Sequence, residues 1–260
     1  MTAFAALHRP GTPLLLPNAW DGASALALAE QGFAAIGTTS LGVAAAAALP
    51  DGEGATRGET LRLARLLGGR PFLLSVDAES GFSDDPAEVA AYARALQDAG
   101  ATGINLEDGR PDGTLAPADL HAAKITAVKD TAPGLFVNAR TDTYWLGGDR
   151  AAQTQARLDA YQRAGADGVF VPGLSDLAAI AAVVRDLRVP LNILYRPGGP
   201  GVAELAAVGV ARVSLGSLLF RAALGAALRC AEEIRAGSAP SVPAEPIPGY
   251  AEVQRLTASG

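Results

Sequence analysis

Short, continuously apolar segments recur along the chain and alternate with segments of helical character. Eight such segments occur, at 13–18 (PLLLPN), 34–39 (AAIGTT), 72–78 (FLLSVDA), 103–108 (GINLED), 135–141 (LFVNART), 168–173 (GVFVPG), 191–196 (LNILYR) and 211–216 (ARVSLG). None of them alternates polar with apolar residues, so both faces of each strand are expected to be buried, as in a parallel sheet covered by helices. Eight strands with roughly as many helices predict a single-domain (β/α)8 barrel of the TIM type over residues 1–236.

Helices are expected between these strands, for example at 22–31, 87–99, 152–164 and 218–234. Gly32, Gly100, Gly165 and Gly209 stand between a helix and a strand, where glycine can take the left-handed conformation that ends a helix. An open doubly wound sheet is the alternative, but no glycine-rich dinucleotide loop follows the first strand. Residues 237–260 contain four prolines and predict an extended tail over the surface or over a neighbouring subunit.

Composition narrows the classes of partner. The 260-residue chain carries a net charge of −6, which argues against nucleic acid and against an anionic membrane surface. A single cysteine excludes a disulfide framework. The first residues lack the basic and apolar regions of a secretory signal, so a cytoplasmic protein without membrane contact is expected.

Carboxylates collect at the ends of the central strands, where barrel enzymes place their catalytic groups. Asp77 and Glu79 follow the third strand two residues apart and are expected to point to one side. Glu107 ends the fourth strand, and Asp51 lies in the loop after the second. Such carboxylates repel one another unless a cation lies between them. An all-oxygen site suits Mg²⁺, with Mn²⁺ as an alternative, so Asp77, Glu79, Glu107 and Asp51 are the predicted metal-site residues.

A cation at the end of the fifth strand suggests the ligand. Arg140 can bind a carboxylate through two parallel hydrogen bonds. A metal beside this arginine predicts a 2-oxo or 2-hydroxy acid, whose carboxylate and C2 oxygen would chelate the metal, with an enolate stabilised there. Trp20 and Asn192, at the ends of the first and seventh strands, are also predicted to contact the substrate. His121 and Lys124 are expected at solvated helix positions.

Six segments in order resemble the isocitrate lyase / phosphoenolpyruvate mutase superfamily across almost the whole chain. They are PNAWD (17–21), TTSLG with LPDGE (38–42, 49–53), VDAESGF (76–82), GINLEDG (103–109), NARTD (138–142) and VSLGSLLFRAA (213–223). The resemblance implies a (β/α)8 barrel that binds Mg²⁺ and a 2-oxo acid. It also implies a homodimer or homotetramer in which the last helix is exchanged between subunits.

The resemblance also implies roles for individual residues. Asp77, Glu79 and Glu107 match the carboxylates around the metal, and Asp51 would reach the metal through water. Thr39, Ser40 and Leu41 match the loop that holds the substrate carboxylate with hydroxyl and N–H groups. Arg140 matches the substrate-binding arginine, and catalytic roles are assigned to Arg140, Glu107 and Asp51.

The segment after the fourth strand, EDGRPDGTLAPADL, departs from both well-characterised branches of that superfamily. Its expected lid, 109–116, lacks the cysteine motif of the lyases and the lysine and asparagine of the phosphonate enzymes. Tyr195, Asp112, Arg110 or a metal-bound water are the candidate proton donors. A carbon–carbon lyase or decarboxylase is the favoured function. A phosphonopyruvate-type mutase or hydrolase and a non-catalytic oxo-acid-binding barrel are the alternatives.

Overall fold

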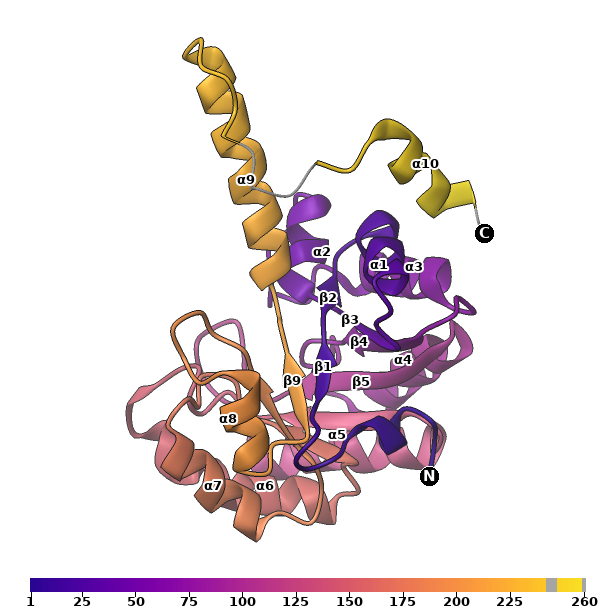
Figure 1. The fold of residues 1–260 in the computed structure, drawn as a ribbon. Coiled ribbons are helices and arrows are strands. Elements are labelled where there is room, and N and C mark those ends of the chain that lie inside the picture. The colour runs from indigo at the N-terminus through magenta and orange to yellow at the C-terminus, as the bar shows by residue number, and fades with distance from the viewer. Residues whose placement is uncertain (242–246, 259–260) are drawn as a thin grey trace.

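The computed structural model describes residues 1–241 and 247–258. Within these residues, nine parallel strands form one sheet that curls into a nearly closed barrel, in the order β1-β9-β8-β7-β6-β5-β4-β3-β2 (Figure 1). The strands are β1 (Leu14–Leu16), β2 (Asn18–Ala19), β3 (Ala35–Thr38), β4 (Leu73–Asp77), β5 (Ala101–Glu107), β6 (Phe136–Arg140), β7 (Gly168–Phe170), β8 (Leu191–Leu194) and β9 (Arg212–Ser214). The predicted barrel is confirmed.

The ninth strand arises because the first predicted strand is divided at Pro17. Proline has no N–H to donate to a neighbouring strand, so a sheet ladder is interrupted there. The part before it, β1, pairs with β9, and the part after it, β2, pairs with β3. The carbonyl of Pro17 still accepts a hydrogen bond from the Gly37 N–H at 2.8 Å. One short segment therefore joins the two edges of the sheet.

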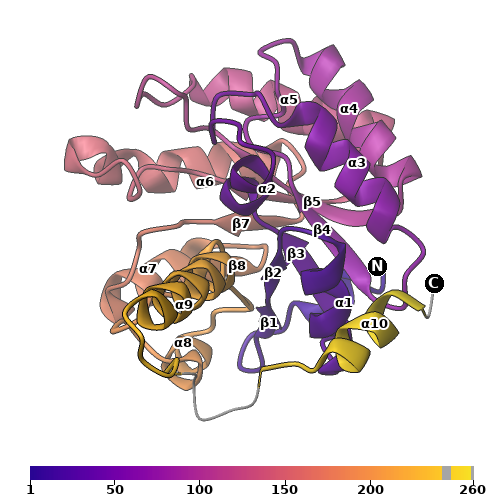
Figure 2. The same ribbon diagram turned by 90° about the horizontal axis from the view of Figure 1, so that it is seen from above.

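Helices surround the sheet on its outer side (Figure 2). They are α1 (Gly22–Glu30), α2 (Ser40–Ala46), α3 (Arg57–Leu67), α4 (Pro86–Asp98), α5 (Ala118–Thr131), α6 (Thr154–Arg163), α7 (Leu177–Asp186), α8 (Val202–Ala207), α9 (Leu218–Arg235) and α10 (Tyr250–Ala258), with 3-10 turns η1 (Ala5–Leu7) and η2 (Gly148–Gln153). In the part of the chain that the structure describes, no helix combines the length and apolarity needed to cross a bilayer.

The inside of the barrel is partly polar. Inward-facing side chains in TIM-type barrels are mostly branched and apolar. Here Asn105, Asn138, Asn192, Arg212 and Ser214 are all buried on the strands and hydrogen-bonded to one another. Apolar packing is concentrated between the strands and the outer helices, where Ile104, Val137 and Tyr161 belong to one large cluster. The polar interior leads directly to the end of the barrel where the strands finish.

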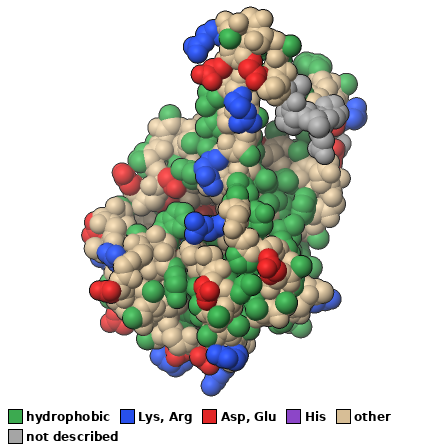
Figure 3. Space-filling model, turned by 60° about the vertical axis from the view of Figure 1, so that its left-hand side comes forward, with side chains coloured by type: hydrophobic (Ala, Val, Ile, Leu, Met, Phe, Trp, Pro, Cys, Tyr) green, Lys and Arg blue, Asp and Glu red, His purple; other side chains and the backbone are tan. Residues whose placement is uncertain are grey.

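Helix α9 projects from the barrel and buries none of its residues (Figure 1). Leu224, Leu228 and Ile234 on this helix are 49%, 60% and 60% exposed. Figure 3 shows further apolar side chains on the surface at its base. A helix with exposed leucines fits the expected exchange between subunits, which stays a prediction for this chain.

The tail differs from the extended segment expected after residue 236. Helix α9 ends at Arg235, and residues Tyr250–Ala258 form α10, which lies against α1 (Figures 1 and 2). The segment YAEVQRL (250–256) places apolar residues at helical spacing, which explains this helix after the prolines. Of the proline-rich part, residues 242–246 lie outside the described residues. The division of the chain at residue 236 stays a prediction.

The four glycines predicted to end helices all have positive φ, between 86° and 100°. Gly32 and Gly100 provide a matched pair. A Cβ at Gly32 would meet nothing within 4 Å, whereas a Cβ at Gly100 would lie 2.7 Å from the Gly68 Cα. Left-handed strain costs a non-glycine residue about 1–3 kcal/mol. We expect Gly32→Ala to lower the free energy of unfolding, measured in urea, by about that amount. Gly100→Ala should lower it clearly more. Equal losses would show that the close approach to Gly68 relaxes at no cost.

Candidate active site

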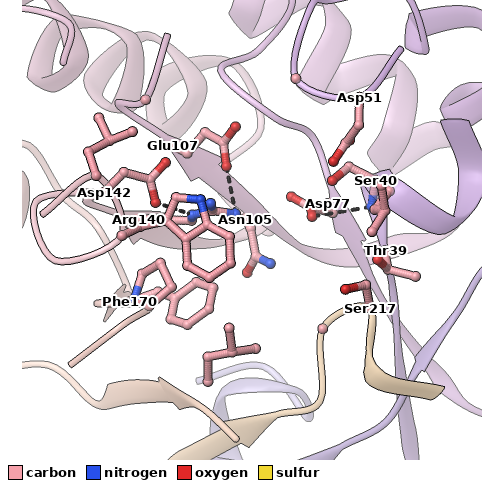
Figure 4. A pocket seen from close by; sticks show the side chains of 18 of the residues that line it. Thr39, Ser40, Asp51, Asp77, Asn105, Glu107, Arg140, Asp142, Phe170 and Ser217 are labelled. Atoms are coloured by element: carbon pink, nitrogen blue, oxygen red, sulfur yellow. Dashed lines mark hydrogen bonds and ion pairs between the residues drawn. The ribbon is translucent and has the colours of Figure 1, made fainter. Parts of the chain in front are cut away.

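A cavity of about 390 Å³ opens where the strands end. Most of the predicted site residues line it, namely Thr39, Ser40, Leu41, Asp51, Asp77, Glu107 and Arg140. Figure 4 shows Glu107, Arg140 and Asp142 on one side, and Asp51, Asp77, Ser40 and Thr39 on the other. They converge because parallel strands finish at the same end of the barrel.

Arg140 is held between two carboxylates. Its Nη1 lies 2.7 Å from Glu107 Oε2, and its Nε donates to Asp142 Oδ1 at 2.7 Å. The guanidinium also lies 5.7 Å from the centre of the Phe170 ring. Burial opposes the charged form, but the two carboxylates outweigh it and raise the pKa of Arg140, which stays a cation. Burial raises the pKa of Glu107 well above its usual range, against the opposing effect of Arg140.

Asp77 faces Arg140 across the cavity and has an unused acceptor. Its Oδ2 accepts a hydrogen bond from the Ser40 N–H at 3.4 Å. Its Oδ1 is buried and has no hydrogen-bond partner among the described residues. Burial raises the pKa of Asp77, because the charged carboxylate is poorly solvated there. A buried carboxylate oxygen of this kind is suited to receive a cation or a protonated group.

Glu79 does not line the cavity. The expected alignment of Glu79 with Asp77 is wrong, because β4 ends at Asp77 and Glu79 takes a left-handed conformation with φ 48°. Its carboxylate accepts hydrogen bonds from the Thr56 hydroxyl and from the Gly54 N–H, the latter at 3.3 Å. Glu79 therefore holds the loop that carries Asp51. Its predicted contact with a metal stays a prediction.

Two residues predicted to touch the substrate also lie elsewhere. Trp20 lines a separate cavity bounded by α1, α2 and α3, with its ring 5.5 Å from that of Phe220. Asn192 is fully buried and hydrogen-bonded to Ser214. Trp20 directly follows β2, whereas Asn192 is the second residue of β8 and does not stand at its end. Their distance from the mouth could not be judged from strand ends alone.

No three His, Cys, Asp or Glu side chains among residues 1–241 and 247–258 stand close enough to form a ready-made metal cluster. The predicted four-carboxylate site is thus not assembled as such. Glu107 is engaged by Arg140, and Glu79 is turned toward Thr56. Asp77, Asp51 and Glu53 line the cavity without an ion-pair partner among the described residues, and Asp77 and Asp51 are the two of them predicted to receive a cation. Mg²⁺ needs no more, since it commonly keeps several waters and takes one or two protein carboxylates plus substrate.

Asp108 makes a network of buried hydrogen bonds behind Arg140. From the sequence, a metal-binding and catalytic role is predicted for its neighbour Glu107 and none for Asp108. Asp108 is fully buried, and Oδ2 accepts from the Tyr161 hydroxyl at 2.6 Å, Thr141 Oγ1 at 2.8 Å and Arg157 Nη1 at 3.0 Å. Oδ1 accepts from the Asp142 N–H at 2.9 Å. These bonds fix residues 141 and 142 directly after β6. Through them Asp108 sets where Asp142 meets Arg140.

Two residues expected at solvated positions are buried. His121 is 0% exposed, with its ring 4.6 Å from that of Tyr161 and both ring nitrogens unpartnered among the described residues. Lys124 is 1% exposed, and its Nζ bonds to the Ser80 carbonyl and to Asp84. The expectation was wrong because α5 turns this side toward α4 and α6. Only the three-dimensional packing shows which helix face is covered.

The predicted lid is a short, tied segment. Gly109 and Leu115 form an antiparallel bridge, and Arg110 pairs with Asp84, which is also bound by Lys124. Arg110, Pro111 and Trp145 line the cavity, whereas Asp112 and Tyr195 do not. Of the protein side chains considered as proton donors, only Arg110 therefore faces the cavity.

The chain matches a family model described as phosphoenolpyruvate phosphomutase over residues 4–235. It is 45% identical to an uncharacterized protein of Mycobacterium tuberculosis, over 97% of this chain and 95% of that one. It is 31% identical to an oxaloacetate decarboxylase of Pseudomonas aeruginosa, over 66% of this chain and 62% of that one.

Solved structures share this fold, and two of them show how close the likeness is. A putative lyase/mutase from Burkholderia cenocepacia has a TM-score of 0.88 at 39% identity, covering 98% of this chain and 94% of that one. A phosphonopyruvate hydrolase in complex with oxalate and Mg²⁺ has a TM-score of 0.84 at 25% identity, covering 99% of this chain and 94% of that one.

Removing the Asp108 carboxylate should destabilise the protein strongly. Asp108→Ala leaves the Arg157 guanidinium buried without its charged partner, which typically costs about 3–5 kcal/mol. We expect a loss of that size in the free energy of unfolding. Asp112→Ala, four residues along the chain, removes an exposed carboxylate and should leave stability almost unchanged. Similar losses for both variants would contradict the role of Asp108.

Buried histidines should make the fold sensitive to acid. Burial lowers the pKa of His121 from 6.5 to about 4, and that of His8 from 6.5 to about 3. Below about pH 6.5 these histidines are protonated in the unfolded chain but stay neutral in the folded one. The free energy of unfolding should therefore fall with pH, by at most about 1.4 kcal/mol per pH unit for each histidine. His121→Phe should show a shallower decline between pH 6.5 and 4. Identical slopes for variant and wild type would count against this origin.

Proposed function

Because the chain belongs to the isocitrate lyase / phosphoenolpyruvate mutase superfamily, we propose that it is a Mg²⁺-dependent carbon–carbon lyase or decarboxylase that acts on a small 2-oxo or 2-hydroxy acid. One observation carries the proposal. The Arg140 cation and the unpartnered Oδ1 of Asp77 belong to opposite sides of one cavity (Figure 4). A ligand with acidic oxygens and a bound cation could satisfy both.

Asp77 would hold the metal through Oδ1, and Asp51 would reach it through water. Mn²⁺ is the other hard cation that this oxygen set would accept. When bound, such a cation supplies positive charge beside the ligand carboxylate and C2 oxygen and thereby stabilises an enolate. Residues 39–41, at the end of β3, line the cavity on the Asp77 side and offer hydroxyl and N–H groups for the ligand carboxylate.

Arg140 would bind the far carboxylate of the substrate. The contacts with Glu107 and Asp142 use Nη1 and Nε, so the Nη2 group of Arg140 can donate to the ligand carboxylate. In a decarboxylation, the bond between C3 and the leaving carboxylate breaks, carbon dioxide leaves, and the electron pair remains as a pyruvate enolate that takes a proton at C3. Bond cleavage needs no proton at the start. A lid without cysteine, lysine or histidine is therefore compatible with decarboxylation, and a similarity to an oxaloacetate decarboxylase supports it.

Phosphorus–carbon chemistry is the second candidate, favoured by the family model and by the likeness to a phosphonopyruvate hydrolase. The absence of lysine and asparagine from lid residues 109–116 argues against this chemistry. A barrel that binds an oxo acid without turnover is the third. The three differ in products. A decarboxylase gives pyruvate with carbon dioxide from oxaloacetate, a mutase or hydrolase gives phosphoenolpyruvate or phosphate with pyruvate from phosphonopyruvate, and a binding barrel gives no product.

The first experiment is a thermal-unfolding series with oxalate, which resembles the pyruvate enolate, in the presence and absence of Mg²⁺. Ligand at 100 times its Kd should stabilise the wild type by about 2.7 kcal/mol, but only with the metal. Asp77→Asn should abolish this stabilisation, since the amide cannot replace the carboxylate as a ligand. Asp98→Asn, on the exposed side of α4, is the control and should respond as wild type.

Pyruvate release from oxaloacetate, corrected for the spontaneous reaction, then tests turnover. A wild-type protein that oxalate never stabilises, with either Mg²⁺ or Mn²⁺, would overturn the proposal. Binding of oxalate without product from oxaloacetate would favour the alternatives. Phosphoenolpyruvate or phosphate formed from phosphonopyruvate would then indicate phosphorus–carbon chemistry, and neither product would indicate a binding barrel.

A further inference from the structure

Asn105 on β5 lies at the centre of the cavity, and no role is predicted for it from the sequence. It lines the cavity together with Asp77 and Arg140, and Figure 4 shows it between them. The strand register explains this position, because Asn105 stands opposite Asp77 on β4 and opposite Asn138 on β6. Any ligand that spans from the Asp77 side to Arg140 would pass Asn105.

The orientation of the Asn105 amide is determined by its neighbours. Its Oδ1 accepts hydrogen bonds from Asn138 Nδ2 at 2.9 Å and from Arg212 Nη2 at 3.2 Å. Asn138 could in principle be turned to present its oxygen, but a guanidinium has only donors. The atom that faces Arg212 must therefore be the amide oxygen. The Nδ2 group is then directed away from Arg212, and it has no hydrogen-bond partner among the described residues.

Arg212 is itself held in the barrel interior. It is 1% exposed on β9, and its Nε donates to Ser214 Oγ at 3.1 Å. Ser214 is in turn bonded to Asn192. A charged donor on the carbonyl oxygen polarises an amide and makes its N–H groups better donors. The buried arginine thus points a strengthened neutral donor at the cavity without lining the cavity itself.

We propose that Asn105 is a substrate-contacting residue that donates an N–H from Nδ2 to an oxygen of the bound acid, and that Arg212 is a positioning residue that fixes this donor. The inference rests on the proposed function and names the contact that recognises the acid oxygen between Arg140 and the metal side. Donors placed where charge develops stabilise an oxyanion more than a neutral carbonyl. The contact therefore favours ligands that present an oxygen at this point over those that present a methyl group.

The closing experiment measures the Kd of oxalate by calorimetry at saturating Mg²⁺. Asn105→Asp keeps the side-chain shape and an acceptor for Arg212 but offers the ligand a carboxylate instead of a donor. We expect its oxalate affinity to fall by roughly 10-fold or more, the usual effect of losing a hydrogen bond to a charged group. Asn105→Ala, which adds no charge, should also bind oxalate more weakly than the wild type. Ser75→Ala changes another buried polar side chain on the barrel strands that does not line the cavity, and should bind as wild type.

Arg212→Met tests the positioning role, since it leaves Asn105 in place but frees its amide to turn. Oxalate affinity should fall less than in the Asn105 variants and recover in part in Arg212→Lys. A general loss of structure would instead lower the melting temperature of the ligand-free protein without rescue by lysine, and would overturn the positioning role. Wild-type oxalate affinity in both Asn105 variants would overturn the contact while the proposed function stands. Absence of oxalate binding in the wild type would overturn both.

Discussion

Neutralisation of buried carboxylates by two arginines organises the mouth of the barrel. Arg140 lies between Glu107 and Asp142, and Arg157 pairs with Asp108 behind them. Removing charges from water costs several kcal/mol for each ion unless partners with good geometry are present. The two arginines supply such partners and leave Asp77 as the buried carboxylate with an unused oxygen. Negative charge without an ion-pair partner therefore lies on the Asp77 side of the cavity, opposite Arg140.

Inside the barrel, below this mouth, another buried arginine is surrounded by hydrogen-bonded polar side chains. Arg212 lies among asparagine and serine side chains, and burial lowers its pKa to about 9 against the opposing effect of Asp77. It remains a cation at neutral pH, as a second positive charge deeper than Arg140. An interior of this kind is less stabilising than packed leucine and valine, because each polar group must find a partner. In return, it holds the amide of Asn105 in one orientation.

The segment after β5 departs from the expected lid motifs, while most of the predicted site residues still line one cavity. The segment after β5 carries no cysteine, lysine or histidine, and instead Arg110 is tied to Asp84, which is bound by the buried Lys124. Such ties place a backbone segment over one side of the cavity without adding an acid or base. Asp77, Glu107 and Arg140, which are predicted to bind metal and substrate, line the same cavity from the strand ends.

The barrel and the composition of its mouth could be predicted from the sequence, because continuous apolar runs and the residues that end them are local properties. All eight predicted strands form, and most predicted site residues line one cavity. Three features depend on partners distant in the chain: Glu79 turns toward Thr56, His121 is covered by Tyr161, and Asn105 is oriented by Arg212, 107 residues away. Strand periodicity specifies which side a residue faces only while the strand continues, and β4 ends at Asp77. The direction of each polar group at the mouth was therefore decided by tertiary contacts, since buried donors and acceptors must pair with whatever the fold brings beside them.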